Sequence, residues 1–333
     1  MHFTIIFCFC VSLAHPLWVK KDVNLMVAPV VVSGLLVEGQ TSTLHSPATT
    51  EGIPTTSTIS KTTTSQHSSP TTGGEFYEGA GGITYSPYQK SGQCKTLEMV
   101  RSDLERLRGF SIIRIYATDC DILMNLKKCL STSQKVMVGI WDLGKVSQGV
   151  SDISTTFNGD FARVHSVSVG NELVNSGQAS AEDVQAAVSK ARVQLREIGY
   201  QGPVVSVDTL VAVTANPALC GVSDFLAVNS HPYWDGNVEP SNCGAWLQNQ
   251  IANLQAKCGS QKPILITESG WPNAGDTNGK CQPSQENMQR CIRSINHVVG
   301  PQVLLFSTFN DYWKDPGPKN VEQRWGIFGD PAF

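Results

Sequence analysis

Two glutamates stand at the ends of apolar runs of the kind that form buried strands. Glu172 follows VHSVSVGN, and Glu268 follows PILIT. Either glutamate alone is best read as a surface residue that begins a loop, since a charge beside an apolar run needs an exposed, partnered position. Together they can break a glycosidic bond, because one carboxyl protonates the leaving oxygen while the other attacks the sugar carbon. A retaining reaction of this kind requires carboxyl groups about 5–5.5 Å apart.

Further polar and aromatic residues stand at the ends of similar runs. Asn171, beside Glu172, can donate a hydrogen bond to a sugar 2-hydroxyl, a bond that strengthens in the transition state. Aromatic faces can stack under sugar rings and line a polysaccharide groove, although some of these side chains would instead pack the top layer of the fold. The remaining candidate substrate-binding residues are Tyr85, Arg114, Tyr116, Asp119, His231, Tyr233, Trp271, Asp311 and Lys314.

The elements that must position these residues are eight short apolar runs, separated mostly by amphipathic helical windows. Near-continuous apolar strands are typical of a parallel sheet covered on both faces, and eight strand–helix repeats over about 250 residues predict a (β/α)₈ TIM barrel. An open doubly wound sheet is the alternative, but no GxGxxG or P-loop motif follows any run. Residues 142–163 show little periodicity and are expected to form a long loop. The runs are 81–86, 111–116, 135–141, 164–170, 203–208, 225–231, 263–269 and 303–309.

The chain divides into three segments. Residues 1–14 hold an apolar stretch that is too short to span a membrane, and they read as a signal peptide. Residues 15–79 are expected to be a disordered, O-glycosylated linker, since 19 of the 32 residues in 41–72 are Ser or Thr. Within this linker, the apolar run 25–37 has no physical explanation. Residues 80–333 form the predicted catalytic domain.

Composition and cysteine content argue against nucleic-acid binding, a membrane span and a metal site. The net charge is −3 and 16% of the residues are charged, which argues against a nucleic-acid partner. No run is long enough for a membrane span. Eight of the ten cysteines follow the predicted signal peptide, and an even number in a secreted chain indicates disulfides whose pairing the sequence leaves open. Neither CxxC nor HxxxH spacing occurs, so we expect no metal site, and two carboxylates require no cofactor.

Four motifs, in their order and spacing, resemble glycoside hydrolase family 17, the family of plant and fungal β-1,3-glucanases. They are IRIYATD, VGNELV, ITESGWPNAG and FNDYWKDPG, and the ending VEQRWGIFGD is similar to the fungal cell-wall branch. The resemblance implies that Glu268 is the nucleophile and Glu172 the acid/base. It also implies that Asp311 and Lys314 match a family carboxylate and lysine near the nucleophile. The plant motif has glutamate where this chain has Asp311, so the role of that residue is open.

The motifs leave three functions open. The first is a secreted, monomeric, retaining glycosidase that acts on β-1,3-glucan of the fungal cell wall. The second is a transglycosylase that uses the same two glutamates and passes the sugar to another glucan hydroxyl instead of water. The third is an inert wall-binding protein, which the presence of Glu172, Glu268 and Asn171 disfavours. The sequence does not distinguish endo from exo action.

Overall fold

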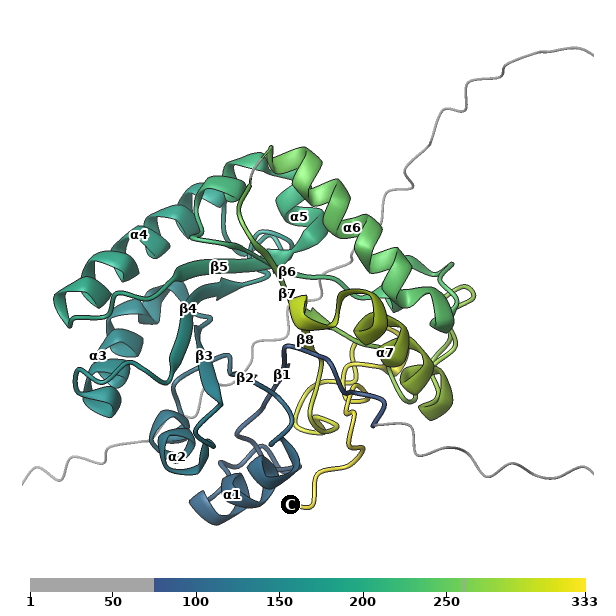
Figure 1. Ribbon diagram of the computed structural model, residues 1–333, viewed down its shortest axis with the longest axis horizontal. Coiled ribbons are helices and arrows are strands. Elements are labelled where there is room, and N and C mark those ends of the chain that lie inside the picture. Colours follow the sequence, from purple (N-terminus) through teal and green to yellow (C-terminus); the bar gives the residue numbers. More distant parts are fainter. Residues whose placement is uncertain (1–74, 260) are drawn as a thin grey trace, which may run out of the picture. The chain divides into compact units, whose positions relative to one another are not determined.

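A computed structural model describes residues 75–259 and 261–333. Eight parallel strands follow one another around a closed barrel, and β1 pairs with β8 through Ile83 opposite Leu305 (Figure 1). The predicted (β/α)₈ barrel is therefore confirmed, and ring closure rules out the open sheet. The strands are β1 (Gly82–Thr84), β2 (Ile112–Arg114), β3 (Lys135–Ile140), β4 (Val164–Asn171), β5 (Val204–Thr209), β6 (Leu226–Asn229), β7 (Ile264–Ser269) and β8 (Val303–Leu305).

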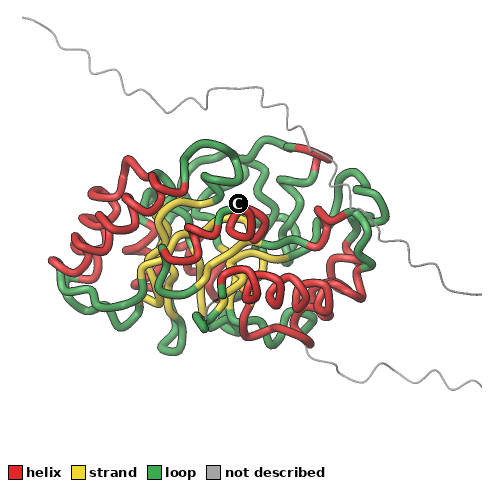
Figure 2. Tube along the Cα trace, turned by 90° about the horizontal axis from the view of Figure 1, so that it is seen from above, coloured by secondary structure: helices red, strands yellow, loops and turns green. Residues whose placement is uncertain are grey.

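An α-helix follows each of the first seven strands, and these helices surround the barrel (Figures 1 and 2). Side chains at the helix starts satisfy backbone N–H groups, as in the capping box of Ser180 and Asp183. The helices are α1 (Leu97–Arg106), α2 (Ile122–Cys129), α3 (Val146–Phe157), α4 (Ala181–Glu197), α5 (Leu210–Ala215), α6 (Cys243–Cys258) and α7 (Gln285–Val299).

Helix α3 lies in the segment that was expected to be a long loop, so that expectation was wrong. Val146, Val150, Ile153 and Phe157 are buried at helical spacing, although Ser, Thr and Gly between them dilute the pattern. Gly149 has a packing reason, since a Cβ there would lie 2.7 Å from the Ile140 side chain of β3. Helix α3 has only a narrow apolar face, and Gly149 lets it pack closely against β3.

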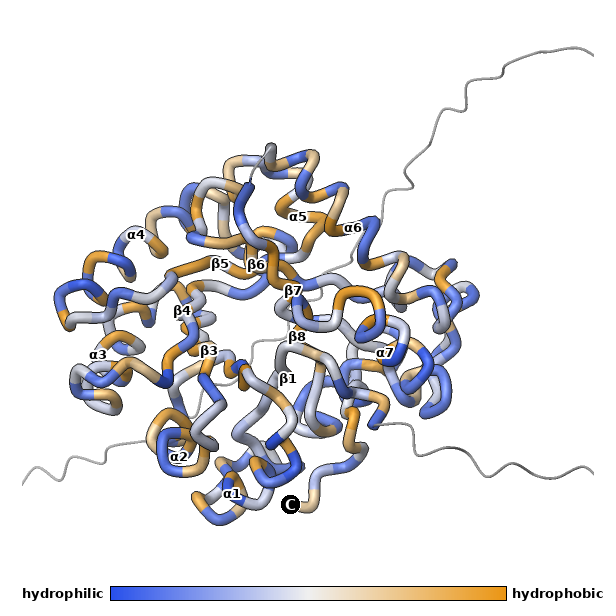
Figure 3. Tube along the Cα trace, viewed as in Figure 1, coloured by the Kyte–Doolittle hydropathy of each residue, from blue (hydrophilic) through white to orange (hydrophobic). Residues whose placement is uncertain are grey.

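The buried apolar side chains form two clusters. The larger cluster lies between the strands and the helices and includes Val204, whereas its neighbour Val205 belongs to a small cluster with Met137, Val207 and Leu304. Adjacent strand residues face opposite sides of a sheet, so the small cluster fills the barrel interior. In Figure 3, β5 and β6 are mostly apolar, and the helices alternate between polar and apolar residues.

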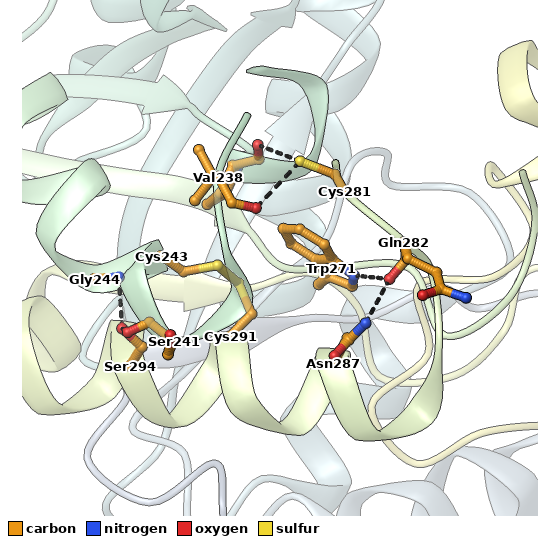
Figure 4. Close-up of a disulfide and its surroundings, with 11 residues drawn as sticks. Val238, Ser241, Cys243, Gly244, Trp271, Cys281, Gln282, Asn287, Cys291 and Ser294 are labelled. Carbon is orange, nitrogen blue, oxygen red and sulfur yellow. Dashed lines mark hydrogen bonds between the residues drawn. A yellow bond between two sulfur atoms is a disulfide. The ribbon is translucent and has the colours of Figure 1, made fainter. Parts of the chain in front are cut away.

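Six of the eight cysteines in 80–333 form disulfides. Cys94–Cys120 joins the loops that follow β1 and β2, and Cys220–Cys258 joins the region after α5 to the end of α6. Cys243–Cys291 joins α6 to α7 (Figure 4). The other two, Cys129 and Cys281, are not disulfide-bonded, and the buried Cys281 thiol lies 3.4 Å from the Val238 carbonyl oxygen.

The predicted signal peptide and nearly all of the predicted linker, including the run 25–37, lie outside the described residues. The last residues before the barrel are described, and the Tyr77 ring packs against Phe110 and Phe328 at centroid distances of 5.5 and 5.1 Å. Within residues 75–259 and 261–333, no helix has the length and apolar character to cross a membrane. In the same part of the chain, His, Cys, Asp and Glu side chains form no group of three that could hold a metal ion.

Candidate active site

The carboxyl ends of all eight strands lie at one rim of the barrel, and two of them place the glutamates. Glu268 lies within β7, and Glu172 directly follows β4, where its N–H donates to the Val207 carbonyl of β5. Glu172 has φ +56°, a left-handed conformation that is uncommon for a residue with a Cβ. The Asp208 carboxylate holds the turn that follows, because it accepts from the backbone N–H groups of Val174 and Asn175.

Glu268 is surrounded by donors and positive charge. One carboxylate oxygen, Oε1, accepts from Arg114 Nη1 at 2.6 Å and from the Tyr116 hydroxyl at 2.9 Å. The other, Oε2, lies 3.6 Å from His231 Nε2. Burial alone would raise the pKa of Glu268, but the Arg114 charge and then His231 outweigh burial and lower it to about 2. Glu268 is therefore ionised at neutral pH.

Glu172 has the opposite electrostatic environment. Burial raises the pKa of Glu172 to about 7, and the negative charge of Glu268 contributes to the rise. A hydrogen bond of 2.8 Å from the Asn229 amide to Glu172 Oε1 opposes it. Two carboxyl groups with pKa values pushed apart can serve as a proton donor and an ionised nucleophile in one site.

A chain of hydrogen bonds connects the two glutamates. Arg114 donates from Nη1 to Glu268 and from Nη2 to Asn171 Oδ1, at 2.8 Å. Asn229 Nδ2 donates to the same Asn171 oxygen at 3.3 Å and to Glu172 Oε1. The barrel register also places Asn229 of β6 opposite Glu268 of β7. The carboxyl groups of Glu172 and Glu268 therefore belong to one hydrogen-bonded site.

A second group of predicted residues lies along the ends of β1, β2 and β8. Asp119 accepts from the Tyr88 hydroxyl at 2.6 Å, and the Tyr88 ring packs against Trp313, whose indole donates to Asp311. Asp311 also pairs with Lys314 at 2.8 Å. Burial lowers the pKa of Lys314, but the Asp311 charge, followed by Glu322 and Glu268, raises it overall. Lys314 is therefore a cation, and its charge interacts with the negative charge of Glu268.

Three predicted residues lie outside these contacts, in the buried wall of the barrel. The Tyr85 hydroxyl donates to Asp103 of α1, and the Tyr233 hydroxyl donates to the Asp276 carbonyl. The Trp271 indole donates to the Gln282 carbonyl, as Figure 4 shows. All three side chains are at most 1% exposed, and their polar atoms are bonded to protein groups. Their assignment to substrate binding stays a prediction.

Sequence reasoning did not select Asn229, Asp208 or Glu322. Asn229 is the last residue of β6 and Asp208 the next-to-last residue of β5, so the strand-end rule that found the glutamates could also have found them. Glu322 comes from the C-terminal segment, where no strand marks it. Burial raises the pKa of Glu322, as do Glu268 and Asp311, whereas Lys314 and His231 oppose the rise. The Glu322 carboxyl group therefore interacts electrostatically with the charged residues of the site.

A hollow of about 270 Å³ opens at the ends of β2 and β3. Trp141 is 36% exposed there, and Asp119, Asp142, Asp152 and Gln148 provide polar atoms around it. An exposed indole among carboxylates and an amide is suited to a sugar ring, because the ring offers an apolar face and several hydroxyls.

A family model described as the BtgE/BtgC glycoside hydrolase domain matches residues 82–326. The chain belongs to this glycoside hydrolase family. The family's relatives include the cell surface mannoprotein MP65 of Candida albicans, which is 44% identical over 78% of this chain and 69% of that protein. The probable family 17 glucosidase SCW4 of Saccharomyces cerevisiae is 43% identical over 77% of this chain and 67% of its own. The resemblance to family 17 that the motifs carried is confirmed.

Two enzymes of known structure have the same fold. An active-site mutant of the Rhizomucor miehei β-1,3-glucanosyltransferase, in complex with laminaritriose, superposes with a TM-score of 0.64 and 20% identity. The match covers 75% of this chain and 93% of that chain. CJP38, a β-1,3-glucanase and allergen of Cryptomeria japonica pollen, superposes with a TM-score of 0.57 and 19% identity over 74% and 95% of the two chains. At these identities the likeness is one of fold.

Proposed function

We propose that this protein is a retaining glycosidase that acts on β-1,3-glucan by double displacement. The observation that carries the proposal is the pair of opposite pKa shifts, to about 2 at Glu268 and about 7 at Glu172, within one hydrogen-bonded network. Two family 17 relatives are named as probable glucosidases, which supports a glucose-containing substrate, and the resemblance of the motifs to β-1,3-glucanases supports β-1,3-glucan.

The reaction begins when Glu268 attacks the anomeric carbon. A bond forms between that carbon and Glu268, the glycosidic C–O bond breaks, and Glu172 gives its proton to the departing oxygen. Glu172 then removes a proton from the acceptor, which displaces Glu268 and restores both carboxyl groups. Arg114 keeps Glu268 ionised for the first step, and no cofactor takes part in the proposed route.

The substrate groups around the glutamates are assigned as part of the proposal. Asn171 donates to the sugar 2-hydroxyl, because its Oδ1 is occupied by Arg114 and Asn229. Tyr116 and His231 flank Glu268 and would contact the same sugar. The remaining candidates, Asp119, Asp311 and Lys314 at the rim with Tyr85, Tyr233 and Trp271 in the wall, keep a proposed role in binding.

The names of the relatives also favour a location in the fungal cell wall, since one is a cell surface mannoprotein. Residues 1–14 would direct secretion, and residues 15–79 would carry O-linked glycans. We propose that the protein acts there as a monomer.

A transglycosylase is the second candidate. The hollow beside Trp141 favours it, because a second glucan chain bound there could supply the hydroxyl that displaces Glu268. Incubation with a defined β-1,3-gluco-oligosaccharide separates the two outcomes. Products longer than the substrate establish transfer, whereas exclusively shorter products establish hydrolysis.

The variant Glu268→Gln tests the proposal as a whole. Loss of the ionised nucleophile should reduce the rate on soluble β-1,3-glucan by at least about 1000-fold. Glu286→Gln on the exposed face of α7 serves as the control and should act like the wild type. Equal, measurable rates for Glu268→Gln and the wild type would contradict Glu268 as the nucleophile, and a wild type without activity would leave the inert wall-binding function.

A further inference from the structure

We propose that Asn229 is a positioning residue that decides which oxygen of Glu172 carries the transferable proton. Its amide group occupies Oε1 of Glu172, so the proton is held on Oε2. The inference rests on the proposed function, because it assigns a step to Glu172 as the acid. Asn229 ends β6, is 2% exposed and contacts no other charged side chain by a hydrogen bond among the described residues.

The orientation of the two amides follows from Arg114. A guanidinium group can only donate hydrogen bonds, so the atom of Asn171 that faces Arg114 must be the acceptor Oδ1. Asn229 approaches that same oxygen and must present its donor, Nδ2, toward it. The same Nδ2 then faces Glu172 Oε1 at 2.8 Å. Arg114 thereby orients the Asn171 amide, and Asn171 orients the Asn229 amide so that its N–H group donates to Glu172.

Thr267 holds the amide from its other side. The Thr267 hydroxyl donates to Asn229 Oδ1 at 2.7 Å, and Thr267 is fully buried in β7. A rotated Asn229 amide would place Oδ1 against Asn171 Oδ1, so that two acceptors would meet. The Thr267 hydroxyl can donate or accept, so it holds the amide in place, and the Asn171 oxygen is the neighbour that favours this orientation. In the other orientation, the two facing oxygens would be buried and unpaired.

The consequence concerns the neutral form of Glu172. In a carboxylic acid the carbonyl oxygen accepts hydrogen bonds better than the hydroxyl oxygen does, so a donor at Oε1 favours the proton on Oε2. Oε2 is then the oxygen that protonates the leaving group and later removes the proton of the acceptor. Glu268, His231 and Asp208 are the charged or titratable groups that also act on Glu172.

Two substrates with different leaving groups test this role in the full protein. A β-1,3-gluco-oligosaccharide needs a proton on its leaving oxygen, whereas laminaribiosyl fluoride releases fluoride with little need for one. For Asn229→Ala, kcat/KM on the oligosaccharide should fall about 10- to 100-fold, as expected for a misplaced acid, with a much smaller fall on the fluoride. Thr267→Val keeps Asn229 but removes its restraint, and it should give the same selective loss in smaller measure.

An equal loss on both substrates would overturn the inference, because a merely structural role lowers both rates alike. Undiminished activity on the oligosaccharide would overturn it as well. A ¹³C NMR titration of the Glu172 carboxyl needs no turnover and separates this inference from the proposed function. Asn229→Ala should raise the pKa of Glu172, since it removes a donor to the ionised form, and an unchanged value would contradict the inference. A wild type that cleaves neither substrate would refute the proposed function instead.

Discussion

The two proposed catalytic carboxyl groups differ in what surrounds them rather than in residue type. Glu268 is next to a buried guanidinium group, a phenol and an imidazole, whereas Glu172 receives one amide donor and faces the negative charge of Glu268. A buried cation favours the ionised form of a carboxyl group, and burial beside a like charge favours the neutral form. The division of labour between nucleophile and acid is therefore set by Arg114 more than by any other side chain.

The pKa values predict the pH dependence of kcat/KM. Glu172 must be protonated to act as the acid, so activity should be present below its pKa of about 7 and should be lost as the pH rises through that value. Glu268 must be ionised, so activity should fall only as the pH drops toward about 2. A profile of kcat/KM on laminari-oligosaccharides measures both limbs. An alkaline limb near the ordinary pKa of glutamate would contradict the assignment of Glu172.

Replacing Arg114 should affect both activity and stability. Arg114→Met leaves the Glu268 carboxylate buried without its main partner, so the pKa of Glu268 should rise and the acidic limb should move to higher pH. Loss of one partner of a buried pair should also lower the free energy of unfolding by about 3–5 kcal/mol, measured in urea. Arg108→Met breaks an exposed pair with Glu105 and is the matched control, with little change expected in either quantity. An acidic limb that stays in place would show that Arg114 does not set the charge of Glu268.

At the scale of elements, the strand ends and the loops that follow them position the site. Glu172 leaves β4 in a left-handed conformation, and Asp208 at the end of β5 holds the turn that follows through two backbone N–H groups. Asp208 is 4% exposed, so the surrounding protein holds its carboxylate in place beneath these donors. Neighbouring strands thus determine the direction of Glu172 as much as its own strand does.

Asp208→Ala should weaken the turn without removing any atom of Glu172. The backbone N–H groups of Val174 and Asn175 would lose their acceptor, and the free energy of unfolding should fall by about 1–3 kcal/mol in urea. Activity should fall as well, because Glu172 is no longer held in its conformation. The control Asp183→Ala removes an exposed capping carboxylate of α4 and should leave activity unchanged. Full activity in Asp208→Ala would show that the turn forms without this carboxylate.

The sequence predicted the strands and the two glutamates because each depends on local pattern. Apolar runs mark the strands, and the rule that chemistry occurs at strand ends selects Glu172 and Glu268. The direction of a side chain depends on register and twist, so the sequence did not reveal that Tyr85 and Trp271 enter the barrel wall. Asn229 stands at a strand end too, but an asparagine there is also an ordinary turn residue. Only the three-dimensional positions of Arg114 and Thr267 show that the Asn229 amide donates to Glu172.

At the scale of the whole barrel, disulfides fasten the helices and loops that surround the strands. Cys94–Cys120 joins two loops at the rim that holds the site, and Cys243–Cys291 joins α6 to α7 across 48 residues of sequence. A cross-link stabilises mainly by restricting the unfolded chain, and the effect grows with the length of the closed loop. The disulfides therefore support a barrel whose β1, β2 and β8 are only three residues long.

Removal of Cys243–Cys291 should lower stability while the site remains intact. The double variant Cys243→Ala, Cys291→Ala should lose about 4 kcal/mol of unfolding free energy, measured with guanidinium chloride under oxidising conditions. Cys129→Ser is the control, because Cys129 is half-buried and forms no disulfide, and it should unfold nearly as the wild type does. Equal stability of all three proteins would show that this bridge does not restrain the unfolded chain.

The central claim is that Glu268 forms a covalent bond to the sugar while Glu172 supplies the proton. A 2-deoxy-2-fluoro-laminaribiosyl fluoride reacts in the first step and slows the second, so the glycosyl-enzyme accumulates and can be weighed by mass spectrometry. We expect one added 2-deoxy-2-fluoro-laminaribiosyl group, a disaccharide, per protein, located by peptide mapping on Glu268, and no addition in Glu268→Gln. An adduct on any other residue, or an unlabelled protein that still cleaves β-1,3-glucan, would contradict it.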